Sequence, residues 1–285
     1  TGTLQYCGIY VDDYLNGEGK EYNEKGQVVY EGNYVMGKRS GMGLYNDYQR
    51  MEVRKGEFKN DQMNGKGTVQ RLGDNALLSE GFFENGVLVE GTRYDSDKHC
   101  IIEEGTFDQN LFIGMKYKDG QPDMYSSFVN DQPSGMTIQY YSNGKVKMEG
   151  CITEGHYEGL FVFYYETGEK WMEVTYERGV EKEKKIYYAN GKIRWMGTIS
   201  NGVIEGVLYD EEGRCKVRGI FNSSNQPMNG KDFLYHKRGS ESICFIRDIC
   251  NGNYKSVMTV YATNYARAFE YDSSWRLVYE GGWTW

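Results

Sequence analysis

Proline is scarce in this chain of 285 residues, which has only 3 of them beside 26 tyrosines and 37 glycines. Disordered chains are rich in proline and poor in aromatic residues, so this composition excludes a largely disordered chain. Glycine reaches about twice its usual share. Many glycines and tyrosines with almost no proline are typical of short strands joined by tight turns, and the composition therefore favours an all-β chain.

Basic segments and long apolar runs are also missing. The chain has 33 Lys and Arg against 41 Asp and Glu, which gives a formal net charge of −8. Nucleic-acid partners are therefore not expected, and adsorption to anionic lipid is disfavoured. No run of 18 apolar residues is present, so no membrane-spanning helix is predicted. The six cysteines are irregularly spaced and form no C-x-x-C pair, which favours reduced thiols and a cytoplasmic location.

Side chains that carry chemistry show no catalytic pattern. The three histidines, His99, His156 and His236, form no H-E-x-x-H motif and no zinc spacing with a cysteine. Glutamates recur one residue before the glycines of a repeated motif, which predicts a structural position and not an active site. These glutamates are Glu31, Glu80, Glu104, Glu149 and Glu280. We therefore expect no enzyme activity, no metal site and no cofactor.

A repeated glycine motif organises the chain. Its clearest copy is YEGNYVMGKRSGMGLY, residues 30–45. Ten units follow one another at intervals of 21 to 25 residues, and each has an aromatic or aliphatic residue two positions after its anchor. The anchors are the structural repeat glycines Gly8, Gly32, Gly56, Gly81, Gly105, Gly150, Gly197 and Gly219, with Ser126 and Val174 in place of glycine in two units. An eleventh, weaker unit surrounds Ile249. Such periodicity is typical of a repeat architecture.

Residue chemistry predicts that each unit is one β-hairpin. Alternation places Tyr30, Gly32 and Tyr34 on one face of a strand. We expect a second strand after a loop, and then a type I′ turn at dipeptides such as Asn143-Gly144 and Asn190-Gly191. Because the anchor glycines lack a Cβ atom, we expect an aromatic ring from a neighbouring hairpin to lie over them.

Residues 30–43 resemble the MORN repeat, whose core reads Y-x-G-x-W-x-x-G-K-x-x-G-x-G, with Tyr34 in place of tryptophan. Residues 137–219 are more similar to the bacterial antitoxin-type variant of this repeat. The resemblance implies an all-β, elongated antiparallel β-hairpin repeat solenoid, a single twisted meander of about 11 repeats. We expect one domain, 1–285, with regular repeats over 6–231 and an irregular C-terminal cap over 232–285.

Aromatic doublets are the candidate partner-binding residues. They recur one repeat apart, with two tryptophans 24 residues apart nearby; the set is Tyr140, Tyr141, Tyr164, Tyr165, Tyr187, Tyr188, Trp171 and Trp195. Strand alternation puts one ring of each doublet toward the core and the other outward. Two interpretations stay open: the rings only cover neighbouring glycines, or the outward rings form a protein-binding stripe.

Three functions are compatible with these features. The first is a non-enzymatic scaffold that binds a protein partner along an extended face. The second, implied by the resemblance of residues 137–219, is an antitoxin or immunity protein, whose acidic charge suits a basic toxin. The third is a membrane or phosphoinositide tether, which the net charge disfavours. The identity of the partner and the face that binds it do not follow from the sequence.

Overall fold

The computed structural model describes the backbone of residues 4–235, 243–262, 265–271 and 277–284, and the side chains of residues 4–233 and 247–253. All regular structure in these residues is β-strand, which confirms the predicted all-β fold of antiparallel hairpins. Over the same ranges there is no helix long and apolar enough to cross a membrane. The chain divides into two units, Thr1–Gly144 and Lys145–Trp285, which we describe separately.

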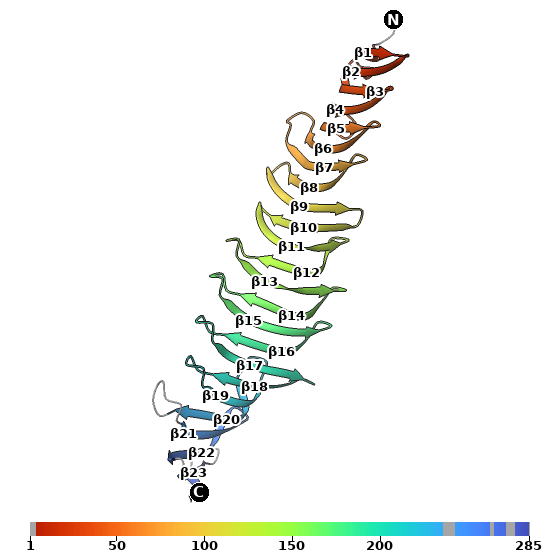
Figure 1. Ribbon diagram of the computed structural model, residues 1–285. Helices are drawn as coiled ribbons and strands as arrows, with labels where there is room; N and C mark the ends of the chain where they lie inside the picture. The colour runs from red at the N-terminus through yellow and green to blue at the C-terminus, as the bar shows by residue number, and fades with distance from the viewer. Residues whose placement is uncertain (1–3, 236–242, 263–264, 272–276, 285) are drawn as a thin grey trace. The chain divides into compact units, whose positions relative to one another are not determined.

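The first unit is an open sheet in which each strand pairs antiparallel with the next one in the sequence (Figure 1). Its strands are β1 (Tyr6–Val11), β2 (Tyr14–Tyr22), β3 (Val28–Val35), β4 (Lys38–Asp47), β5 (Glu52–Lys59), β6 (Gln62–Arg71), β7 (Leu77–Glu84), β8 (Val87–Asp95), β9 (Cys100–Asp108), β10 (Leu111–Lys118), β11 (Gln121–Val129) and β12 (Gln132–Tyr140).

The second unit repeats this arrangement, again with antiparallel pairing in chain order. Its strands are β13 (Val146–Thr153), β14 (His156–Tyr164), β15 (Lys170–Glu177), β16 (Val180–Tyr187), β17 (Ile193–Ser200), β18 (Val203–Tyr209), β19 (Cys215–Phe221), β20 (Pro227–Tyr235), β21 (Ile243–Cys250), β22 (Asn253–Ala262), β23 (Tyr265–Tyr271) and β24 (Leu277–Thr284). The irregular segment expected over 232–285 therefore continues the strand pattern where it is described.

The tight turns lie at the opposite end of the hairpin from the one predicted. Asn201 and Gly202, between β17 and β18, have φ angles of 50° and 78°, as a type I′ turn requires. Asn190-Gly191 instead belongs to a longer loop in which only Gly191 has a positive φ. The Asn190 side chain accepts a hydrogen bond from the Lys192 amide (3.0 Å). Because asparagine stabilises both conformations, the dipeptide alone did not distinguish the turn from the loop.

A continuous row of glycines crosses the first unit, and we call it the glycine ladder. Each member lies opposite the next on the adjacent strand; the members are Gly8, Gly19, Gly32, Gly43, Gly56, Gly67, Gly81, Gly91, Gly105 and Gly114. A Cβ atom added at Gly114 would lie 2.2 Å from the Glu104 carbonyl oxygen. The second unit has a shorter ladder of Gly197, Gly206, Gly219 and Gly230. The anchor glycines thus allow neighbouring strands to approach where a side chain does not fit.

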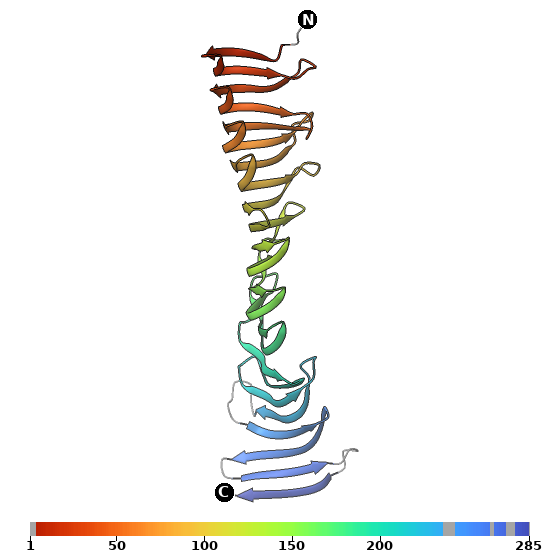
Figure 2. The ribbon, with the colours of Figure 1, turned by 90° about the vertical axis from the view of Figure 1, so that its right-hand side faces the viewer.

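The core lies on one face of each sheet, and the strands curve around it (Figure 2). In the first unit the residue two positions after each anchor from Gly32 onward is 2–8% exposed, which confirms the predicted face; these residues are Tyr34, Phe58, Phe83, Phe107 and Phe128. Cations cover this thin core, since the Arg93 guanidinium lies 4.0 Å from the Phe107 ring centre and the Lys116 ammonium lies 4.4 Å from that of Phe128.

Aromatic rings do cover ladder glycines, but mostly within their own hairpin. Cβ positions at Gly197 and Gly206 are 2.6 and 2.8 Å from the Trp195 ring, and all three residues belong to the β17–β18 hairpin. The predicted cover from a neighbouring hairpin occurs at Gly19, where Tyr34 approaches to 3.2 Å. The prediction of ring cover is therefore correct, and its assignment to the neighbouring hairpin is wrong for Trp195.

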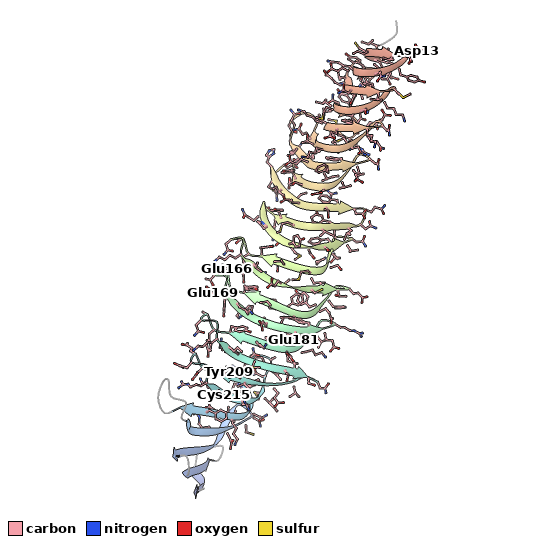
Figure 3. All side chains as sticks on the ribbon, viewed as in Figure 1. Asp13, Glu166, Glu169, Glu181, Tyr209 and Cys215 are labelled. Atoms are coloured by element: carbon pink, nitrogen blue, oxygen red, sulfur yellow. The ribbon has the colours of Figure 1, made fainter. Side chains whose placement is uncertain are left out.

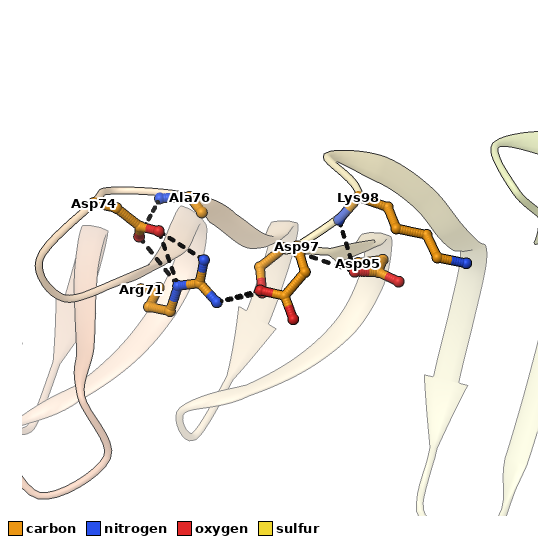
Figure 4. Close-up of polar contacts among 7 residues, drawn as sticks. Arg71, Asp74, Ala76, Asp95, Asp97 and Lys98 are labelled. Carbon is orange, nitrogen blue, oxygen red and sulfur yellow. Dashed lines mark hydrogen bonds and ion pairs between the residues drawn. The ribbon is translucent and has the colours of Figure 1, made fainter.

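Ion pairs join consecutive loops of the first unit (Figure 4). Arg71 contacts Asp74 in its own loop and Asp97 in the next one, both at 2.6 Å. Hydrogen bonds from Arg71 and from the Ala76 amide lower the pKa of Asp74 to about 2. Because these groups are exposed, the ion pairs contribute little to the stability of the sheet.

Candidate functional site

The first tyrosine of two doublets lies on the face opposite the core, where it forms a hydrogen bond. The Tyr164 hydroxyl donates to Glu149 (2.6 Å) and the Tyr187 hydroxyl donates to Glu173 (2.8 Å). Two earlier hairpins contain the same pair, Tyr94 with Glu80 and Tyr117 with Glu104. We call these four contacts the tyrosine–glutamate pairs.

The tyrosine–glutamate pairs change the acidity of the phenols. Burial, followed by the hydrogen bond to the carboxylate, raises the pKa of each phenol to about 12; the four are Tyr94, Tyr117, Tyr164 and Tyr187. The glutamates occupy the slot that the sequence predicts to be structural, and their partner tyrosine follows 13 to 15 residues later. This spacing is the signal by which the pairs could have been found. Glu280 lies outside the residues whose side chains are described.

The second tyrosines of the doublets do not form a uniform stripe. Tyr165 is 37% exposed, whereas Tyr141 and Tyr188 are half-buried. The Tyr188 hydroxyl donates to the Tyr209 carbonyl (2.8 Å), which fixes its ring against the next hairpin. Tyr140, the first ring of its doublet, is half-buried at the end of β12. One of the three doublets therefore presents an exposed outer ring.

The two tryptophans lie in different environments. Trp195 is 1% exposed, in the core, whereas Trp171 is 40% exposed. Although they are 24 residues apart, their anchors Val174 and Gly197 are 23 apart, so Trp171 precedes its anchor by three residues and Trp195 by two. Trp171 is left unpaired at a bulge between Lys170 and Met172, whereas Trp195 pairs with Ile186 in the regular ladder and faces the core. Trp195 was therefore wrongly included among the partner-binding residues.

The exposed tryptophan belongs to a chain of ring contacts that we call the aromatic row, formed in order by Phe161, Phe163, Trp171 and Tyr165. Ring centres are 6.3 Å apart from Phe161 to Phe163, 6.4 Å from Phe163 to Trp171 and 6.2 Å from Trp171 to Tyr165. Phe161 is fully buried. The row thus leads from the core to the surface and holds its two exposed rings in place.

The loop after β14 borders the exposed end of the aromatic row. The Tyr165 amide donates to the Glu169 carbonyl (2.9 Å), and the Lys145 ammonium donates to the Thr167 carbonyl (2.5 Å). Glu166 and Glu169 lie at this loop edge of the unit (Figure 3) and are exposed. The exposed rings of Trp171 and Tyr165 therefore adjoin a loop that carries the acidic side chains Glu166 and Glu169.

The position of Trp171 is occupied by cations in the adjacent hairpins. Counted from the anchors, Lys147 and Arg194 are its equivalents, and both are exposed. The exposed aromatic site is therefore particular to the β14–β15 loop and is not a property of every repeat. The described side chains contain no group of three or more potential metal ligands.

Comparison with known families agrees with this geometry. A family model described as a MORN repeat variant matches residues 15–36, 134–152 and 157–178. The chain contains MORN-type repeats. MORN repeats are generally modules that bind proteins or membranes, and they form a non-enzymatic repeat family. The variant, predicted for residues 137–219, also matches near the N-terminus. No curated protein matches the sequence.

Proposed function

We propose that this chain with MORN-type repeats is a non-enzymatic scaffold that binds a protein partner through the exposed end of the aromatic row. The observation that carries the proposal is the contact between Trp171 and Tyr165, which are 40% and 37% exposed. Tryptophan and tyrosine are enriched among the residues that contribute most to protein binding.

The support beneath these rings favours a binding role. Phe163 contacts Trp171 from the core side, and the loop hydrogen bonds fix the backbone at Tyr165. Exposed rings that are already held in position lose little conformational entropy when a partner binds. The same two rings on a mobile loop would bind more weakly.

The charge around the site supports a particular kind of partner. The chain carries a net charge of −8, and the loop between Tyr165 and Trp171 contains the exposed Glu166 and Glu169 together with Lys170. A partner with an apolar contact surrounded by Lys or Arg fits this surface, and opposite charges accelerate association. A basic toxin is one such partner. The antitoxin role, the lipid tether and the cytoplasmic location all stay predictions.

The test compares affinity capture by the full chain with capture by two variants. Trp171→Arg introduces the residue type of the adjacent hairpins, so we expect an unchanged melting temperature. It should weaken partner binding by about 2 kcal/mol, roughly 30-fold. Arg194→Ala alters the equivalent position of the next hairpin and should retain binding. A partner captured equally by the parent chain and Trp171→Arg would contradict the proposal.

A further inference from the structure

An open hollow of about 600 Å³ lies across β4 to β7, on the face of the first unit that is opposite to its core. Its floor is the backbone of the glycine ladder at Gly56, Gly67 and Gly81. Its walls are side chains that point away from the core, because Phe58 and Phe83, two residues after the anchors of these strands, are buried on the other face. We call it the ladder hollow.

Lysines beside the glycine ladder usually contact a carboxylate on the adjacent strand. Four lysines stand directly next to a ladder glycine. Two of them lie outside the hollow, and each meets an acidic residue directly opposite. Lys20 contacts Glu31 (2.9 Å), and Lys231 contacts Asp248.

The two lysines of the ladder hollow have no such partner. Lys55 faces Leu44 on one side and Thr68 on the other. Lys66 faces Phe82, and its ammonium lies 5.4 Å from the centre of that ring. Among the side chains that the structure describes, no carboxylate forms an ion pair with either lysine, and both lysines are exposed.

Two glutamates beside the same glycines do not neutralise these lysines. Glu80 accepts a hydrogen bond from the Tyr94 hydroxyl (2.5 Å), which holds its carboxylate toward β8. The Glu57 carboxylate lies beside Gly65. The hollow therefore offers two ammonium groups that are not engaged with an acidic side chain of the sheet.

The two ammonium groups can reach one ligand group. Lys55 is opposite Thr68, and Lys66 precedes Thr68 by two residues, so the lysines are diagonal neighbours on β5 and β6. Diagonal neighbours on one face lie about 7–8 Å apart. Two flexible lysine side chains at this distance can donate to the two oxygens of one carboxylate.

Exposed apolar side chains stand at both ends of the ladder hollow. Met42 on β4 is 56% exposed, and Phe82 on β7 is 45% exposed. Three strand spacings separate these strands, which is about 14 Å. An extended chain of about four residues spans this distance.

We infer that the ladder hollow binds an acidic segment of a partner protein, in which carboxylates alternate with apolar side chains. The carboxylates pair with Lys55 and Lys66, and the apolar side chains pack on Met42 and Phe82. Two lysines are fewer than the about four to eight cations of a site for anionic lipid, and the net charge of −8 opposes such a surface. The hollow is also too open to enclose most of a small molecule, as small-molecule sites do.

This site differs from the exposed end of the aromatic row in its place and in the charge of its partner. It lies in the first unit and takes an acidic segment, whereas the aromatic row lies in the second unit and is proposed to take a basic one. A scaffold with both sites binds two partners of opposite charge. Trp171→Arg should leave the ladder hollow intact, so the two proposals fail independently.

The test uses the full chain and a fluorescein-labelled peptide of sequence GEFELEG, with binding followed by fluorescence anisotropy. We expect saturable binding that weakens as salt is added. Lys55→Ala and Lys66→Ala should each raise the Kd about tenfold, without a change in melting temperature because both lysines are exposed. Lys59→Ala is the matched control, since it removes the same charge from the same strand outside the hollow. It should change the Kd by about twofold or less.

Two further probes separate the ligand classes. The uncharged peptide GQFQLQG should bind about tenfold more weakly than GEFELEG. Phosphatidylcholine vesicles that contain phosphatidylserine should not sediment the chain. The inference is overturned if GEFELEG shows no saturable binding, if GQFQLQG binds equally well, or if Lys59→Ala weakens binding as much as Lys55→Ala. Sedimentation with the vesicles that is lost in Lys55→Ala would also overturn it, because the hollow would then take a lipid.

Discussion

The hairpins β15–β16 and β17–β18 fill the space at the anchor position in different ways. In β17–β18 the ladder positions are Gly197 and Gly206, and the Trp195 ring lies over both. In β15–β16 the anchor is Val174, which is 1% exposed, and Met172 stands two residues before it. A large ring therefore covers bare backbone in one hairpin, and the anchor side chain fills the space itself in the other.

In these two hairpins the core volume at the anchor is filled either by the anchor side chain or by the residue two positions before it. The β3–β4 hairpin also has the glycine form, since the Tyr30 hydroxyl lies against the Cβ positions of Gly32 and Gly43. Protein interiors are close-packed, so a gain of volume at one position requires a loss at the other. In these three hairpins the residue two positions before the anchor is buried or half-buried: Tyr30, Met172 and Trp195.

The largest loss of stability is expected for Gly197→Val, which gives β17 the anchor residue of β15, a valine. The added Cβ atom would lie 2.6 Å from both the Trp195 ring and the Glu205 carbonyl oxygen. We expect a loss of about 4 kcal/mol in the free energy of unfolding, measured by urea denaturation. Adding Trp195→Met reproduces the Met172–Val174 pair and should recover part of the loss. A double variant less stable than Gly197→Val would contradict shared volume.

The opposite change, Val174→Ala, removes volume from the hairpin that lacks a covering ring. Because Val174 is 1% exposed, we expect a loss of about 2 kcal/mol in the free energy of unfolding. The matched control is Thr175→Ala, next to it on the other face, which should change stability by about 0.5 kcal/mol or less. Equal losses in the two variants would show that the anchor face is not the core at this hairpin.

The back face of the same hairpin is tested by Tyr187→Phe. This variant removes the hydroxyl that donates to Glu173, while Lys170 still contacts that carboxylate at 2.6 Å. We expect a loss of about 1 kcal/mol or less in the urea experiment. A loss as large as that of Val174→Ala would place Tyr187 in the core.

Alkaline pH produces a graded effect through the tyrosine–glutamate pairs. The pKa of each phenol rises from 10 in the unfolded chain to about 12 in the folded one, so between these values the folded state binds more protons. Their contribution to stability is complete below pH 10 and is lost as the pH rises toward 12. Absorbance at 295 nm should show delayed ionisation in the folded protein relative to the chain in urea. Identical tyrosine titration curves for the folded protein and the chain in urea would contradict the raised pKa of the tyrosine–glutamate pairs.

The sequence was sufficient to predict the fold because the spacing of the repeat shows directly where each residue stands on its strand. The anchor at Gly32 and the alternation around it predict the buried face of Tyr30 and Tyr34, and both are buried. The turn position was mispredicted because Asn-Gly dipeptides suit both ends of the hairpin. The candidate site was only partly predicted, because the interval of 24 residues between Trp171 and Trp195 does not show that Trp171 lies at a bulge and Trp195 in the regular ladder. The aromatic row joins residues of β14 and β15 through contacts that a one-dimensional pattern does not show.

Tryptophan fluorescence tests most directly whether Trp195 lies in the core while Trp171 lies at the surface. In a parent with Trp275, Trp283 and Trp285 replaced by Phe, only Trp171 and Trp195 emit. We predict that a further Trp171→Phe change removes the red-shifted emission that acrylamide quenches readily, and leaves a blue-shifted, poorly quenched emission from Trp195. Emission from Trp195 that is red-shifted and as readily quenched as that of the parent would contradict the account.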